Sequence, residues 1–183
     1  MSADLVFLDL EALRDWLWTH EETHDGGWVL LARKGTTVPT SLDYQDALLE
    51  ALCCGWIDGQ RKSVDAETFM IRFTPRRARS IWSQRNVDLV AQLEAEGRMR
   101  ERGRAEVRRA QEDGRWERAY AGSAAIEVPD ELRAALVAAG AWDRFESLSK
   151  SARYSVLHPV VTAVRETTRS ARIARAVQQL AEG

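Results

Sequence analysis

Two short runs, separated by a four-residue turn and ended by a proline, restrict the folds open to this chain. The runs are Trp56–Ser63 and Thr68–Thr74, with Val64–Glu67 between them and Pro75 behind them. The second run alternates apolar and polar residues, as a half-buried strand does, and Pro75 lacks the N–H that a further strand position needs. The pattern predicts a β-hairpin. Its second strand presents two faces, one with Phe69, Ile71 and Phe73 and the other with Met70, Arg72 and Thr74.

Helices and one more strand are expected before the hairpin. Asp9–Leu17 repeats its apolar residues at helical spacing, with its first residue as the N-cap. Trp28–Lys34 is a short run of bulky apolar residues, which is typical of a buried strand. A second helix is predicted over about Leu42–Cys54, capped by Ser41 or Thr40. The N-terminal half therefore predicts an α+β fold in which helices pack with a small antiparallel sheet or hairpin.

The C-terminal half predicts helices only. After a helix that begins near Gln84, glycines and prolines divide the remaining helical segments. These segments are Glu101–Asp113, Pro129–Ala139, Trp142–Leu148, Ser151–Val164 and Thr167–Ala181. We expect an α+β core domain at residues 1–122 and a helical segment at residues 123–183 that packs on it.

Composition excludes several classes of protein. The 183 residues are 45% hydrophobic and 30% charged, which is ordinary for a soluble globular domain. No run of about 18 apolar residues is present to span a membrane. The start of the chain, MSADLVFLDLEALRDW, is acidic and lacks the basic and small-residue pattern of a signal peptide. We therefore expect a cytoplasmic protein without a membrane span.

Cysteine and histidine spacing gives no metal or cofactor signal. Cys53 and Cys54 are adjacent, so a disulfide between them would be strained, and two thiolates are too few for a zinc site. The three histidines complete no ligand pattern. No phosphate-binding or dinucleotide-binding glycine loop occurs. We predict no metal and no cofactor, with both cysteines as small buried side chains.

Cations are concentrated around the hairpin. Between residues 61 and 85 the chain holds Arg61, Lys62, Arg72, Arg76, Arg77, Arg79 and Arg85. Guanidinium groups bind oxyanions through parallel N–H donors, and a helix starting at Ser83 would add free N–H groups. If Arg61 and Arg72 lie across from one another, they would meet the loop that runs from Thr74 to Trp82. The predicted anion site therefore consists of Trp56, Asp58, Arg61, Arg72, Thr74, Arg76, Ser80, Trp82, Ser83 and Asn86.

Most of these residues also have a structural interpretation. Asp58 either pairs with a neighbouring cation or acts as a general base. The stretch 98–109, in which arginines alternate with glutamates, is predicted to be a solvated helix face with i,i+4 ion pairs. The remaining structural roles are core packing for Trp56 and Trp82, a cross-strand contact for Arg72, and turn or cap roles for Ser80, Ser83 and Asn86.

Several blocks of the sequence resemble one bacterial family. They are ALCCGWIDGQRKSVD (51–65), IRFTPRRARSIWSQRN (71–86), AEGRM (95–99), DGRWERAY (113–120) and, more weakly, RETTRSARI (165–173). These blocks are similar to the YdeI/OmpD-associated family, also called the bacteriocin-protection or OmdA family. The chain departs from that pattern after Tyr154, where it reads SVLHP.

The resemblance implies a small cytoplasmic bacterial protein with a role in stress resistance and in protection against antimicrobial peptides or bacteriocins. It implies no reaction and no oligomeric state. The cation-rich segment leaves three functions open. The first is binding of a small anionic ligand through an Arg/Trp site, and the second is an enzyme with Asp58 as acid or base. The third is nucleic-acid binding, which a sequence pI of about 6.0 disfavours.

Overall fold

The computed structural model describes residues 4–122 and 125–182. Within them the chain forms two compact units. The first unit holds residues 4–82 and 86–118, and the second holds residues 83–85, 119–122 and 125–182. That the helical segment packs on the core stays a prediction. In the described residues, no helix combines the length and the apolar character that crossing a membrane requires.

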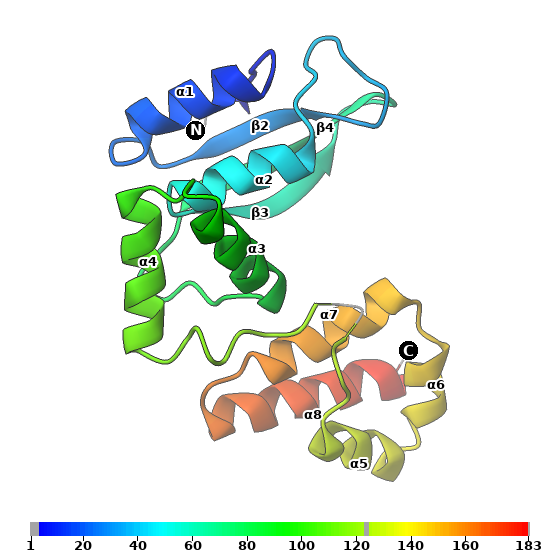
Figure 1. The fold of residues 1–183 in the computed structure, drawn as a ribbon. Coiled ribbons are helices and arrows are strands. Elements are labelled where there is room, and N and C mark those ends of the chain that lie inside the picture. Colours follow the sequence, from blue (N-terminus) through cyan, green and yellow to red (C-terminus); the bar gives the residue numbers. More distant parts are fainter. Residues whose placement is uncertain (1–3, 123–124, 183) are drawn as a thin grey trace. The chain divides into compact units, whose positions relative to one another are not determined.

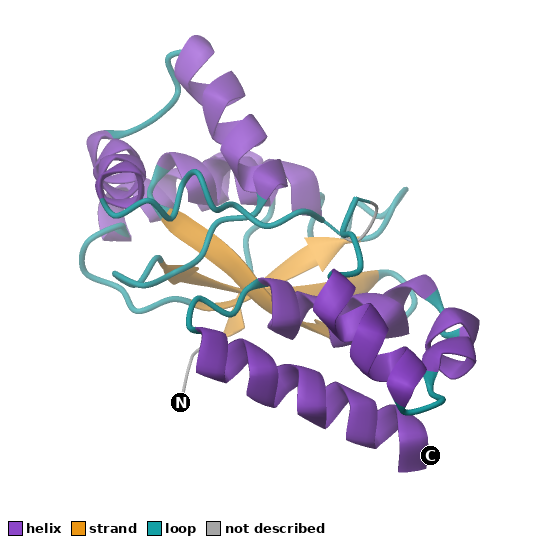
Figure 2. Ribbon diagram, turned by 90° about the horizontal axis from the view of Figure 1, so that it is seen from below, coloured by secondary structure: helices purple, strands orange, loops and turns teal. Residues whose placement is uncertain are grey.

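All strands of the first unit join one sheet, drawn in orange in Figure 2. The strands are β1 (Asp4–Leu5), β2 (Gly27–Ala32), β3 (Trp56–Ser63) and β4 (Thr68–Pro75). Their order is β1-β2-β4-β3, with β1 parallel to β2 and the other pairs antiparallel. The predicted hairpin is confirmed as β3 and β4, and the α+β class is confirmed. The sheet is mixed rather than purely antiparallel because β1 adds a parallel edge.

Helices of the first unit pack on the sheet and on one another (Figure 1). They are α1 (Leu10–His20), α2 (Tyr44–Cys53), α3 (Gln84–Ala95) and α4 (Glu101–Glu112). Helix α2 contacts β3, α1 and α4. The first two residues of α3 belong to the second unit. This packing buries large apolar side chains from every layer, among them Leu17, Leu31, Leu48, Trp56 and Phe73.

The starts of α1 and α2 show how side-chain caps fix the helices. The Asp9 carboxylate accepts a hydrogen bond from the Ala12 N–H at 3.0 Å, which confirms the predicted cap. For α2, the predicted cap at Ser41 or Thr40 is wrong. Asp43 caps this helix by accepting from the Asp46 N–H at 2.9 Å. The hydroxyl of Thr40 instead donates to the Leu8 carbonyl, so it serves the loop before the helix.

The second unit is helical, as predicted. Its helices are α5 (Asp130–Ala138), α6 (Trp142–Ser147), α7 (Lys150–Val161) and α8 (Glu166–Glu182). Helix α8 contacts both α5 and α7. A separate core lies between these helices, built from Leu132, Leu136, Ala141, Phe145, Leu157, Val160, Ala176 and Leu180.

Candidate functional site

Two of the predicted site arginines lie on opposite faces of the sheet. Arg61 pairs in register with Ile71, because a bulge between Asp58 and Arg61 shifts the β3–β4 pairing. Arg72 follows Ile71 along β4 and pairs with Trp28 on the other side. Successive residues of a strand point to opposite faces, so these guanidiniums diverge. The expectation that they lie across from one another is wrong.

Trp56 and Asp58 are held by contacts within the first unit. Trp56 is only 1% exposed, and its indole N–H donates to the Glu21 carbonyl at 3.2 Å. Asp58 is half-buried and accepts a hydrogen bond from the Tyr44 hydroxyl at 2.7 Å. Thr74 pairs with Ile57 near the end of the hairpin. Trp56 therefore lies in the core.

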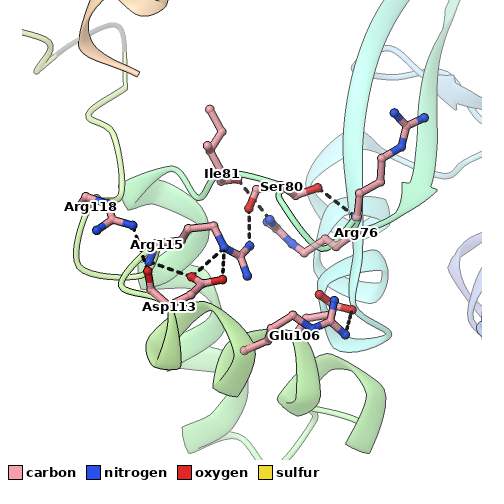
Figure 3. Close-up of polar contacts among 9 residues, drawn as sticks. Arg76, Ser80, Ile81, Glu106, Asp113, Arg115 and Arg118 are labelled. Carbon is pink, nitrogen blue, oxygen red and sulfur yellow. Dashed lines mark hydrogen bonds and ion pairs between the residues drawn. The ribbon is translucent and has the colours of Figure 1, made fainter. Parts of the chain in front are cut away.

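The residues after the hairpin do come together, in what we call the loop cluster: Arg76, Ser80, Trp82, Arg115 and Trp116. The Arg76 guanidinium lies 3.4 Å from the ring centre of Trp82 and donates to the Ile81 carbonyl at 3.3 Å. Arg115 donates to the adjacent Ser80 carbonyl at 2.6 Å. Figure 3 shows these two guanidiniums reaching neighbouring carbonyls of the same loop. These two hydrogen bonds hold the loop in place.

Two members of the loop cluster are buried, and Ser80, Arg115 and Trp116 are half-buried. Arg76 is 5% exposed and Trp82 is 2% exposed, with the Trp82 ring at 4.8 Å from that of Trp116. Asn86 is also buried, whereas Ser83 belongs to the second unit. Part of the predicted site is therefore assembled, as a packed group. That Arg76, Ser80, Trp82 and the other predicted residues bind a ligand stays a prediction.

A more open arrangement of arginines occurs elsewhere in the first unit. A cavity of about 530 Å³, which we call the arginine hollow, lies between α1, the end of α2 and the segment before α4. Its lining residues are Arg14, Trp18, Glu50, Gly97, Arg98, Met99 and Arg100. Three guanidiniums and one carboxylate thus share a hollow with an indole that is 48% exposed.

Glu50 orders two of these guanidiniums. Arg14 and Arg98 donate to the same carboxylate oxygen, Oε1, at 2.8 and 2.7 Å. Burial of Glu50 acts to raise its pKa, but the hydrogen bonds and charges of the two arginines outweigh it, so the pKa is lowered. Glu50 is therefore ionised near neutral pH and holds both cations in place.

Arg100 is ordered in a similar way. Its Nε and Nη2 donate to the two carboxylate oxygens of Glu21 at 2.8 and 3.1 Å, which raises the pKa of Arg100. The guanidinium also lies 4.7 Å from the ring centre of Trp18. This places a fixed cation beside an exposed aromatic surface.

Sequence reasoning missed the arginine hollow because it assigned the wrong partners. Arg98, Arg100 and Arg104 pair with Glu50, Glu21 and Glu94, which belong to other elements. The predicted i,i+4 pairing is thus wrong for them, and Arg109 pairs with Glu106 at i,i+3 instead. One feature of the sequence did point to the arginine hollow, because Trp18 is a large aromatic residue outside the apolar stripe of α1.

Two family models match the chain. A domain of unknown function, DUF8412, matches residues 5–106, which include every residue of the arginine hollow. The bacteriocin-protection, YdeI or OmpD-associated family, OmdA, matches residues 125–183. No curated protein and no solved structure matches the chain. The predicted family resemblance is confirmed. The OmdA match lies in the C-terminal part of the chain, which contains the RETTRSARI block and none of the stronger blocks.

Proposed function

We propose a function for this chain, which belongs to the DUF8412 family and whose residues 125–183 match the bacteriocin-protection, YdeI or OmpD-associated family. The proposed function is binding of a small anionic ligand in the arginine hollow, as part of protection against antimicrobial peptides or bacteriocins. The observation that carries it is the set of three ordered guanidiniums around one accessible cavity.

Charge and order both support an anion in this hollow. Its lining holds Arg14, Arg98 and Arg100 against the one lining carboxylate, Glu50, while Glu21 and Glu96 pair with Arg100 and Arg98 from outside the lining. The hydrogen bond from Arg14 to Glu50 uses one of the five N–H groups of that guanidinium, so donors remain for an oxyanion. Because Glu50 and Glu21 already fix these side chains, binding of a ligand would cost less side-chain entropy.

The exposed indole supports a ligand with a flat apolar part. Trp18 is 48% exposed and lines the hollow beside Arg100. An aromatic ring of the ligand would cover apolar surface on Trp18 while its acidic group reached the guanidiniums. We therefore propose an aromatic or otherwise planar organic anion.

Binding is tested by calorimetry and thermal shift with phenyl phosphate and benzoate as probes. Inorganic phosphate lacks the ring and benzyl alcohol lacks the charge, so both are expected to bind more weakly than phenyl phosphate. Arg14→Gln removes a charged donor and is expected to weaken phenyl phosphate about tenfold or more. Trp18→Ala is expected to weaken phenyl phosphate but not inorganic phosphate.

Arg108→Gln is the matched control, because Arg108 is exposed and pairs with Glu101 outside the hollow. It is expected to bind phenyl phosphate as the unmodified chain does. The proposal fails if none of the anions binds, or if Arg14→Gln and Trp18→Ala bind phenyl phosphate as well as the control does.

The protective role is tested in cells. A bacterial strain that expresses the chain is expected to survive exposure to a bacteriocin or a cationic peptide better than one carrying an empty vector. Arg14→Gln is expected to lose that benefit at equal protein level. Equal survival of all strains would contradict the protective role and leave the binding result standing.

Two further functions and the cellular location stay predictions. An enzyme with Asp58 as acid or base is the first alternative, and the hydrogen bond from Tyr44 is the contact that such a role would have to release. Nucleic-acid binding is the second, and the low sequence pI disfavours it. The cytoplasmic location is checked by cell fractionation.

A further inference from the structure

The second unit contains a hollow of its own between α7 and α8. Its volume is about 570 Å³, within the range of cavities that hold small organic ligands. We call it the α7–α8 hollow. Its polar lining residues are Ser155, His158, Thr162, Arg172, Arg175 and Gln179, and its apolar ones are Val156, Pro159 and Ala176.

The charged residues that line the α7–α8 hollow are both arginines. Arg172 and Arg175 are separated by three positions on α8, so they share one face of the helix. No carboxylate occurs among the lining residues that the structure describes. Arg169, one turn earlier, pairs with Glu131 at 2.9 Å and does not line the hollow. Two cationic charges therefore face this cavity without a lining counter-charge.

Arg172 is held in place from the opposite helix. Its guanidinium donates a hydrogen bond to the backbone carbonyl of Pro159 on α7. Because this acceptor is a neutral carbonyl, the full charge of Arg172 stays available to a ligand. The contact orders the side chain before any ligand arrives, which favours binding.

The other polar groups of this cavity are neutral. His158 contacts the rings of Tyr120 and Tyr154, at 4.7 and 5.3 Å between ring centres. Burial, and to a smaller degree the charge of Arg172, lowers the pKa of His158, so its imidazole is neutral near pH 7. Neutral imidazole, hydroxyl and amide groups suit the hydroxyls of a polar organic molecule.

We propose that the α7–α8 hollow binds a small phosphate monoester. Such a group carries a charge of about −1.5 to −2 near pH 7, which matches the two guanidiniums better than a monocarboxylate does. Parallel N–H donors of arginine suit phosphate oxygens. The cavity is larger than a phosphate group alone requires, and its hydroxyl, amide and apolar walls provide for a short hydroxylated carbon chain.

The charge argument is tested by calorimetry on the full chain with four probes of similar size. Glycerol 3-phosphate is expected to bind at least tenfold more tightly than dimethyl phosphate or glycerate, which carry one negative charge each. Glycerol, which is neutral, is expected not to bind. Equal affinity for glycerate and glycerol 3-phosphate would overturn the choice of a dianion, and no binding of any probe would overturn the site.

Substitutions test the location. Arg175→Gln and Arg172→Gln are each expected to weaken glycerol 3-phosphate about tenfold to a hundredfold. Arg175 has the more exposed side chain, so its variant is the safer one for folding. Arg165→Gln is the control, because Arg165 is exposed and does not line this cavity. Equal binding by Arg175→Gln and Arg165→Gln would overturn the assignment.

A local probe separates this site from the arginine hollow. The chain has three histidines, and only His158 lines the α7–α8 hollow. In NMR spectra, glycerol 3-phosphate is expected to shift the imidazole signals of His158 and to raise the pKa of that residue. Signals of His20 and His24 are expected to stay in place. Movement of those two signals alone would overturn the proposal.

Discussion

Glu50 is a buried carboxylate on which two arginines converge. Its side chain is 3% exposed, while those of Arg14 and Arg98 are 35% and 34% exposed. Its pKa lies below the ordinary value of 4.5, so the ionised form stabilises the fold. That contribution is complete above about pH 4.5 and is lost as the pH falls through the lowered pKa of the folded protein.

We expect Glu50→Gln to lower the free energy of unfolding near pH 7 by about 2 kcal/mol. This is less than the roughly 3–5 kcal/mol of a fully buried broken pair, because both arginines remain partly hydrated. Below the lowered pKa of Glu50 the difference from the unmodified chain should shrink, since Glu50 is then protonated too. Urea unfolding followed by tryptophan fluorescence at several pH values measures both effects.

Glu101→Gln serves as the control, because Glu101 pairs with Arg108 at the surface and is 76% exposed. A change below about 0.5 kcal/mol is expected there. If Glu50→Gln behaves like Glu101→Gln at every pH, the buried pair contributes nothing and the stabilising role of Glu50 is wrong.

At the scale of elements, α4 approaches the end of α2 through a glycine. A Cβ at Gly103 would lie 2.3 Å from the carbonyl oxygen of Cys53 and 2.9 Å from the terminal methyl carbon of Met99. Burial raises the pKa of the Cys53 thiol to about 11, so this cysteine packs as a neutral side chain. The distances at Gly103 mean that α2 and α4 can lie this close because residue 103 has no side chain.

We expect Gly103→Ala to destabilise the protein, although alanine is the better helix former by about 1 kcal/mol. The contact with the Cys53 carbonyl is to backbone, which cannot rotate away, and overpacking of this kind costs about 1–3 kcal/mol. Thermal unfolding measures the net sign. A higher Tm for Gly103→Ala would mean that helix propensity dominates and that the close approach is not required.

Elements with local signals are predictable from the sequence, and their pairing is not. The alternation in β4, its end at Pro75 and the cap at Asp9 are local features, and the structure contains each of them. The two-residue strand β1 has no periodicity of its own and exists through its pairing with β2. The bulge in β3 that shifts Arg61 relative to Arg72 depends likewise on pairing with β4. The sequence alone therefore does not reveal that these two guanidiniums lie on opposite faces of the sheet.

Side-chain partners are harder still to predict. The cation cluster near the hairpin is visible in the sequence, but Arg76 is part of a packed loop and Arg72 lies on the opposite face from Arg61. The arginine hollow uses residues from distant parts of the chain, such as Arg14 with Arg98. Ion pairs between distant elements follow from tertiary packing, which spacing along one segment does not encode.

At the scale of the whole molecule, each unit has its own core. Leu136 is fully buried among the helices of the second unit, whereas its neighbour Val137 is 58% exposed. We expect Leu136→Ala to destabilise the second unit by about 2–5 kcal/mol. In hydrogen exchange, protection should fall in α5–α8 and persist in β2 and β4.

Val137→Ala, one residue away, should change protection in neither unit. If Leu136→Ala lowers protection equally in β2, β4 and α5–α8, the two units unfold as a single cooperative body. The distinct family matches of the two parts would then not correspond to separate folding units.

The ends of the sheet have a consequence for behaviour at high concentration. Within the described residues, which begin at Asp4, one outer strand, β1, covers two residues, and the other, β3, is interrupted by a bulge and carries Arg61 and Lys62. Edge strands that are short, bent or charged are poor templates for pairing with a strand of another chain. The native fold should therefore resist fibrous, strand-to-strand aggregation even when the protein is overproduced.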